Sequence, residues 1–121
     1  MKTDNLNTLA IAYLGDAVFE LYVREHLLNK NIVKVKELQK EAIKYVSAKN
    51  QVRLLEKINN ILTEEEIEIV KKGRNTKSHK APKNTDILTY KHATGFETLI
   101  GYLYINNKIR LEEIMNKILE D

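Results

Sequence analysis

The chain has 121 residues, enough for one hydrophobic core but too few for a catalytic domain plus a separate binding domain of ordinary size. Hydrophobic residues make up 43% and charged residues 31%, which excludes a disordered chain and predicts one soluble globular domain over residues 1–121. The absence of cysteine excludes disulfides, thiol nucleophiles and cysteine-ligated metals, and a net charge of +3 does not by itself indicate a nucleic-acid-binding protein.

The chain begins with polar residues that are not followed by the apolar segment of a signal peptide. No apolar run is long enough to span a bilayer. We therefore expect a cytoplasmic protein that does not associate with membranes. Apolar residues then recur at three- and four-residue spacing from Leu6 to Leu21, which predicts an amphipathic helix that runs to about Leu28.

Residues 35–58 predict a second helical region that is broken near Ser47. Thr63 is a good N-cap for the next helix, and Glu66 completes a capping box with it. We expect that helix to end at Gly73, because glycine readily takes the left-handed conformation of a C-cap.

Residues 74–85 are polar and include the only proline, Pro82, so they predict a long loop. Loops of this length are uncommon in compact domains and are often functional. A further helix is expected to begin at Thr85 or Asp86, and a last one to cover residues 108–119. The sequence shows neither strand alternation nor an internal repeat, so the predicted fold class is all-α.

Asp16 lies in the middle of the first apolar helix, directly after Gly15. A carboxylate is costly to desolvate unless it is paired or binds a cation. Glycine costs about 1 kcal/mol of helix propensity relative to alanine, so close packing against another helix would explain it. Taken alone, an acid on the solvent-facing edge of the helix is the simpler interpretation.

Glu97 is likewise the lone acid of residues 93–104, which also contain Gly95 and Gly101. Two helices that cross near their glycines could bring Asp16 and Glu97 together. Paired carboxylates with open coordination positions suit Mg²⁺. On the residues alone, two unrelated surface acids remain the favoured alternative. Glu20, one turn after Asp16, is expected to form a salt bridge with Arg24 rather than to join the pair.

Basic residues concentrate between the two acids. Six lysines or arginines and no acid occur from residue 71 to residue 83: Lys71, Lys72, Arg74, Lys77, Lys80 and Lys83. Such a run is often only a solvated segment, but its position between the two acids favours contact with RNA phosphates. Lys49, Arg53 and Lys57 form a stripe at four-residue spacing that could also track phosphates, although a solvated face is the simpler interpretation.

Two motifs resemble those of the ribonuclease III family. LGDAV at residues 14–18 is similar to the centre of the family's signature helix, and FETLIG at residues 96–101 is similar to its second acidic motif. GRN at residues 73–75, PKNTD at 82–86 and VSAK at 46–49 resemble the Mini-ribonuclease III branch, which lacks the appended double-stranded-RNA-binding domain. The resemblance covers nearly the whole chain, with the motifs in the right order and spacing.

This resemblance implies a helical, homodimeric, Mg²⁺-dependent endoribonuclease that cuts double-stranded RNA and leaves 5′-phosphate and 3′-hydroxyl ends. Asp16 matches the signature aspartate and Glu97 the catalytic glutamate, so both are expected to be catalytic and to hold the metal. The larger enzymes have three further carboxylates, and this chain has none of them at the matching positions, which are Leu9, Ala12 and Thr94.

The resemblance also implies partners. The branch is associated with maturing the ends of the 23S ribosomal RNA precursor, and the need for a ribosomal protein stays open. Tyr13 stands where the larger enzymes place an aromatic residue that packs into the partner subunit. The alternative for Tyr13 is an ordinary core residue of its own chain.

Two other functions remain open at this stage. One is a non-catalytic RNA- or ribosome-binding helical protein with the same fold, which would need neither Asp16 nor Glu97. The other is a structural helical interaction domain without affinity for duplex RNA. The three histidines, His26, His79 and His92, have no spacing that indicates a zinc site or a catalytic triad.

Overall fold

The computed structural model describes residues 2, 6–76, 83 and 85–120, and these residues confirm the all-α prediction. Over this part of the chain the structure contains helices and no strand. The α-helices are α1 (Thr8–Asn29), α2 (Val35–Val46), α3 (Ala48–Ile58), α4 (Glu64–Asn75), α5 (Ile87–Asn106) and α6 (Lys108–Leu119), with a 3₁₀ turn at Asn59–Ile61.

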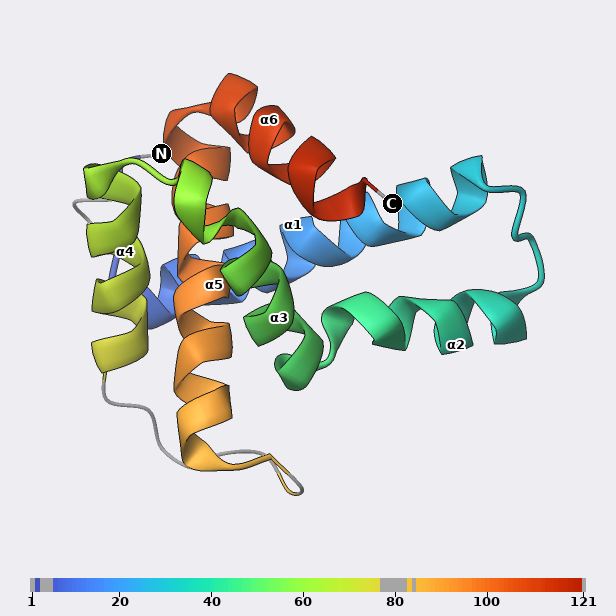
Figure 1. Ribbon diagram of the computed structural model, residues 1–121, viewed down its shortest axis with the longest axis horizontal. Coiled ribbons are helices and arrows are strands. Elements are labelled where there is room, and N and C mark those ends of the chain that lie inside the picture. Colours follow the sequence, from blue (N-terminus) through green and yellow to red (C-terminus); the bar gives the residue numbers. More distant parts are fainter. Residues whose placement is uncertain (1, 3–5, 77–82, 84, 121) are drawn as a thin grey trace.

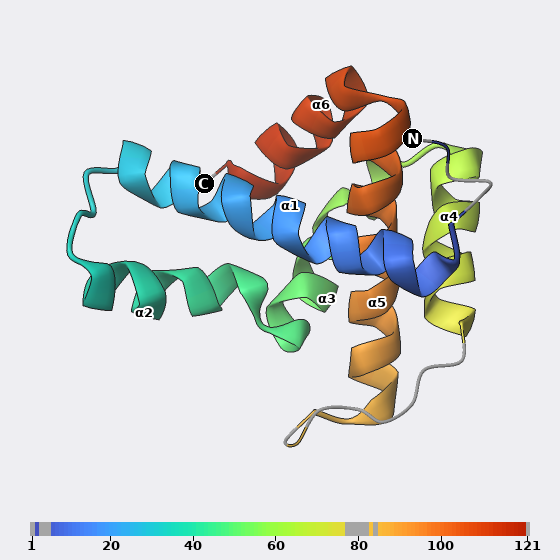
Figure 2. The same cartoon turned by 180° about the vertical axis from the view of Figure 1, so that it is seen from behind.

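Helix α5 is the centre of the fold, and the other helices are arranged around it (Figure 1). Helix α1 crosses α5 on one side, α3 lies on the opposite side, and α4 runs alongside α5, as the reverse view in Figure 2 also shows. The core at this centre includes Phe19 of α1 and Phe96 of α5, both fully buried, whose rings meet edge to face at 5.0 Å. A helix surrounded in this way needs small or apolar residues on most of its sides, and α5 has them.

Local capping sets the helix boundaries where the sequence predicts them. Ser47 takes an extended conformation between α2 and α3, and its side chain accepts a hydrogen bond from the backbone N–H of Asn50 at 3.3 Å. Thr63 and Glu66 form both hydrogen bonds of the capping box at the start of α4. Asp86 caps α5 by accepting a hydrogen bond from the Thr89 N–H at 2.8 Å. These predicted boundaries are confirmed.

The expected helix end at Gly73 is wrong. Helix α4 continues to Asn75, and no described glycine has a positive φ. A Cβ at Gly73 would lie 2.8 Å from the Cβ of Thr98 and 2.9 Å from the Cα of Gly95, so this glycine lets α4 approach α5 closely. The helix ends instead where the Thr76 hydroxyl donates to the Lys72 carbonyl at 2.7 Å.

Helix α1 has two apolar faces, where the sequence predicted one. One face packs in the core, and the other exposes Tyr13, Ala17 and Leu21. Tyr13 is 84% exposed, so the alternative of an intramolecular core residue is wrong. Helix α2 has no fully buried residue and exposes Val35 and Ile43. Within the described residues, no helix has the length and apolarity needed to cross a membrane.

Candidate active site

The two acids singled out in the sequence meet where α1 crosses α5. A Cβ added at Gly15 would overlap the carbonyl oxygen of Glu97 and lie 2.8 Å from the backbone nitrogen of Gly101. A Cβ added at Gly101 would overlap the carbonyl oxygen of Ile11. The backbones of the two helices are therefore in direct contact, which confirms a crossing at the glycines. Gly95 is not part of this crossing, because it faces α4. A Cβ added at Gly95 would lie 2.7 Å from the carbonyl oxygen of Val70.

This crossing brings the carboxyl groups of Asp16 and Glu97 into hydrogen-bonding contact. Asp16 is exposed to solvent, whereas Glu97 is partly buried between the helices. Burial raises the pKa of Glu97 to about 8, and the hydrogen bond and negative charge of Asp16 act in the same direction. In the metal-free protein, Glu97 therefore keeps its proton at neutral pH and can donate a hydrogen bond to the Asp16 carboxylate.

Gln51 is a third member of the site that the sequence analysis did not identify. It lies near the start of α3, is only 2% exposed, and its side chain hydrogen-bonds Glu97 in the sense that lowers the pKa of this carboxyl group. An amide that stabilises a carboxylate in this way is donating its N–H. A signal was present, because Gln51 stands in the buried stripe of α3 with Leu54, Leu55 and Ile58.

The donor set fits a hard divalent cation. Among the described residues, no cluster of three or more histidine, cysteine, aspartate or glutamate side chains surrounds a point where a metal could bind. The carboxylates that the described residues bring together here are those of Asp16 and Glu97, and Mg²⁺ commonly takes one or two carboxylates and keeps several waters. A cation bound by both carboxylates would relieve the repulsion from Asp16 that contributes to the raised pKa of Glu97.

The predicted RNA-binding residues lie on several elements. Lys49 is exposed in the first turn of α3, Lys71 and Lys72 are exposed on α4, and Lys83 is exposed before α5. Lys77 and Lys80 lie outside the described residues. These positions are compatible with the predicted interface but do not test it.

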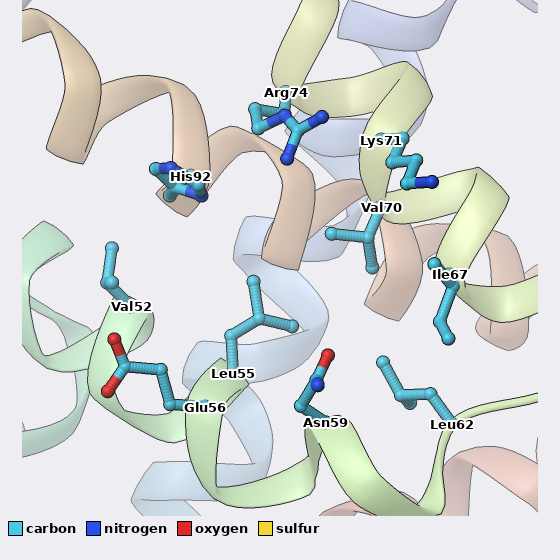
Figure 3. Close-up of a pocket in the computed structure, with 10 residues that line it drawn as sticks. All are labelled: Val52, Leu55, Glu56, Asn59, Leu62, Ile67, Val70, Lys71, Arg74 and His92. Atoms are coloured by element: carbon cyan, nitrogen blue, oxygen red, sulfur yellow. The ribbon is translucent and has the colours of Figure 1, made fainter.

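Arg74 and Lys71 border a pocket of about 390 Å³ between α3, α4 and α5 (Figure 3). Its walls include the apolar side chains of Val52, Leu55, Leu62, Ile67 and Val70. His92 of α5 also lines the pocket. The Lys71 ammonium is also 3.7 Å from the Glu68 carboxylate. Neither Asp16 nor Glu97 lines this pocket, so it is separate from the carboxylate pair.

The basic stripe on α3 does not remain a uniform solvated face. Lys57 donates to the carbonyl oxygens of Ile118 at 3.2 Å and Glu120 at 2.8 Å, so it caps the C-terminus of α6. Arg53 donates to the Lys44 carbonyl at 3.4 Å, across the break between α2 and α3. On α1, the expected salt bridge between Glu20 and Arg24 is present, with 3.6 Å between the carboxylate oxygen and the guanidinium nitrogen.

Comparison with known proteins identifies the family of the chain. The family described as "Ribonuclease III domain" matches residues 9–108, a range that contains Asp16, Gln51 and Glu97. The chain is 46% identical over 114 residues to Mini-ribonuclease 3 of Streptococcus pneumoniae, covering 92% of this chain and 89% of that protein. It is 49% identical over 112 residues to Mini-ribonuclease 3 of Brevibacillus brevis, covering 92% and 84%.

A solved structure supports the fold independently. The crystal structure of a Fusobacterium nucleatum protein superposes with a TM-score of 0.82 at 32% identity, covering 96% of this chain and 94% of that one. The family match, the relatives and the fold agree over nearly the whole chain. The chain therefore belongs to the ribonuclease III family, in its Mini-ribonuclease 3 branch, and is an endoribonuclease of a family that acts on double-stranded RNA.

Proposed function

We propose that this chain is a cytoplasmic, Mg²⁺-dependent endoribonuclease that cuts double-stranded RNA as a homodimer and matures the ends of the 23S ribosomal RNA precursor. Its products carry 5′-phosphate and 3′-hydroxyl ends. The observation that carries the proposal is the contact between Asp16 and Glu97 at the crossing of α1 and α5, inside the matched ribonuclease III domain. A ribosomal protein that presents the RNA fits this role as a further partner.

In this proposal Asp16 and Glu97 hold the metal. Bound Mg²⁺ supplies Lewis-acid chemistry, by making a coordinated water more acidic and by neutralising charge on the phosphodiester. Asp16 is exposed, so its carboxylate is accessible from the side on which RNA would approach. Glu97 lies deeper, and burial between helices restricts the orientations that its carboxylate can take. No side chain has to act as a nucleophile.

RNA recognition is expected to depend on shape and charge. The major groove of A-form RNA is too deep and narrow for side chains to read, so contacts go to phosphates and 2′-hydroxyl groups. The basic residues proposed for this role are Lys49, Lys71, Lys72, Arg74, Lys77, Lys80 and Lys83. The exposure of Lys49, Lys71, Lys72 and Lys83 supports the assignment.

The homodimer is supported by the second apolar face of α1. Tyr13 is 84% exposed and Leu21 is 57% exposed, on the same helix as Asp16. Large apolar side chains gathered on one exposed helix face favour burial against a partner. A two-fold dimer would place two equivalent sites against the two antiparallel strands of a duplex.

The experiment that tests this function is cleavage of an end-labelled RNA duplex by the wild type and Asp16→Asn, with Mg²⁺ or with EDTA. We expect the wild type to cut only with Mg²⁺. Removing one metal carboxylate costs several kcal/mol of transition-state stabilisation, so Asp16→Asn should cut on the order of 10³-fold more slowly. Its duplex affinity should be retained, because Asp16 contributes no positive charge. Equal cleavage by both proteins would contradict the assignment, and binding without any cleavage would favour a non-catalytic RNA-binding protein.

A further inference from the structure

Gln51 is an unusual residue for its position. It is 2% exposed and occupies the apolar stripe through which α3 packs against the rest of the fold. A buried amide without a partner is destabilising, so a hydrophobic residue would be more stable there unless the amide has a specific partner. That partner is the carboxyl group of Glu97.

The backbone around Gln51 is well anchored. Its own N–H donates to the Ser47 carbonyl at 2.9 Å, as the first intrahelical bond of α3. The Ser47 side chain accepts hydrogen bonds from the backbone N–H of Asn50 at 3.3 Å and from its side chain at 2.8 Å. The Gln51 side chain therefore extends from a capped helix turn, and its burial leaves it little room to change rotamer.

The three side chains of the site come from three different helices. Asp16 is on α1, Gln51 on α3 and Glu97 on α5, so Glu97 is contacted from two directions. An amide is the side chain of this size that donates a hydrogen bond without adding charge. A third carboxylate at position 51 would instead add repulsion to a pair that is already short of positive charge.

We propose that Gln51 is a positioning residue for the metal centre: its amide holds the Glu97 carboxylate in the orientation in which it meets Asp16, and so prepares the pair to bind a divalent cation. This inference rests on the proposed metal-dependent function. Residues that hydrogen-bond metal ligands typically contribute about 10- to 100-fold in metal affinity or activity. We expect an effect of that size on the metal affinity of the site.

The test compares the wild type with Gln51→Met, which keeps the length of the side chain and removes its donor. Mn²⁺ is the probe, and its binding to the RNA-free protein is measured by electron paramagnetic resonance. Gln51→Met should bind Mn²⁺ about 10- to 100-fold more weakly than the wild type. Cleavage should require correspondingly more Mg²⁺, and duplex affinity measured in EDTA should not change.

Thr98→Val is the matched control. Thr98 is also 2% exposed and lies on α5 beside Glu97, but its hydroxyl donates to the Thr94 carbonyl at 2.7 Å. The substitution removes one buried polar group of similar size, and we expect it to leave Mn²⁺ affinity within about twofold of the wild type. If it weakens Mn²⁺ binding as much as Gln51→Met does, the effect of Gln51 is merely structural and the inference fails.

A second variant covers the case in which Gln51→Met does not fold. Gln51→Asn retains the amide but is shorter by one methylene group, so the donor no longer reaches Glu97. It should fold, because it removes only one methylene group, and it should show the same weakening of Mn²⁺ binding. Wild-type affinity in a folded variant, whether Gln51→Met or Gln51→Asn, would overturn the inference.

The wild type and Asp16→Asn separate this outcome from failure of the proposed function. If the wild type neither binds Mn²⁺ nor cuts duplex RNA, the metal-dependent function itself is wrong. If the wild type binds and cuts, Asp16→Asn does neither, and the Gln51 variants match the wild type, only the role of Gln51 is wrong.

Discussion

At the scale of single residues, the surroundings of two glutamates give them opposite acid–base behaviour. Burial and the neighbouring Asp16 raise the pKa of Glu97. Glu66 is 5% exposed, yet its pKa is lowered because the Arg110 guanidinium donates to both of its oxygens, at 2.8 and 2.9 Å. The charge of Glu66 is thus balanced by Arg110, and this ion pair links α4 to α6. No positively charged side chain in the described part of the chain compensates Glu97. This is what we expect of a residue that binds a cation.

This difference predicts how the stability of the metal-free protein depends on pH. The pKa of Glu97 is about 8 in the folded state, against 4.5 for an unperturbed glutamate. Between these values the folded state holds a proton that the unfolded state has lost. The protonated Glu97 side chain therefore contributes stability to the folded state, and this contribution is complete below about pH 4.5 and is lost as the pH rises through about 8.

We therefore expect the melting temperature in EDTA to fall between about pH 5 and about pH 9 more steeply for the wild type than for Glu97→Gln. The comparison cancels the other titrating groups, since only residue 97 differs. Thermal unfolding monitored by circular dichroism measures both profiles. Parallel profiles would show that Glu97 does not titrate with a raised pKa.

At the scale of the helices, backbone contact at the glycines assembles the site. Gly15 and Gly101 bring α1 onto α5, and Gly73 and Gly95 bring α4 onto it. The atoms that a new Cβ would meet at the first crossing are backbone atoms, which cannot move aside as a flexible side chain could. The distance between Asp16 and Glu97 therefore depends on these glycines.

Gly15→Ala tests this dependence. Alanine is the better helix former by about 1 kcal/mol, but here the overlap with Glu97 must force α1 away from α5. We expect a net loss of about 3 kcal/mol in the free energy of unfolding, measured by urea denaturation, together with loss of cleavage. Unchanged or higher stability would show that helix propensity outweighs the contact and that the crossing tolerates a methyl group.

The basic stripe of α3 gives a prediction about two lysines on one helix. Lys49 is exposed, whereas Lys57 is bound to the last carbonyls of α6. Lys49→Ala should reduce the slope of log affinity for duplex RNA against log salt by about 1 and leave stability unchanged. Lys57→Ala should lower stability by about 1 kcal/mol and leave that slope unchanged. Fluorescence anisotropy over a salt series measures the slope, and the opposite pattern would exchange the two roles.

At the scale of the whole molecule, α1 carries an exposed apolar face on the same helix as one of the two acids. Tyr13, Ala17 and Leu21 follow one another along it, and Asp16 lies on the same helix. A partner that covers this face would be close to the carboxylates that we propose to be catalytic. Dimerisation and catalysis are thereby coupled in the proposed function.

Tyr13→Glu tests the dimer with a charge on that face. The residue is 84% exposed, so the substitution should not disturb the fold of the protomer, but it should convert a dimer into a monomer in sedimentation equilibrium. Ile109→Glu is the control, because Ile109 is 79% exposed on α6 and should tolerate the charge with no change in mass. A monomeric wild type, or a dimeric Tyr13→Glu, would contradict the proposed interface.

The order and limits of most helices were predictable from the sequence, because the signals are local. Ser47, Thr63 with Glu66, and Asp86 act within one helical turn of the backbone groups that they satisfy. The identity of the two acids was likewise accessible, since a lone carboxylate in an apolar helix stands out and its motif resembles a known family.

The tertiary structure decided the relations between distant residues. Gly73 packs against Gly95 and Thr98, which lie 22 and 25 positions further along the chain, so no local signal could distinguish this role from that of a C-cap. Lys57 caps α6 instead of remaining solvated, and Gln51 reaches Glu97 from a third helix. The sequence shows which residues are apolar and how they are spaced, but only packing shows which of them face the core. The exposure of Tyr13 and the burial of Gln51 were therefore decided by the tertiary structure.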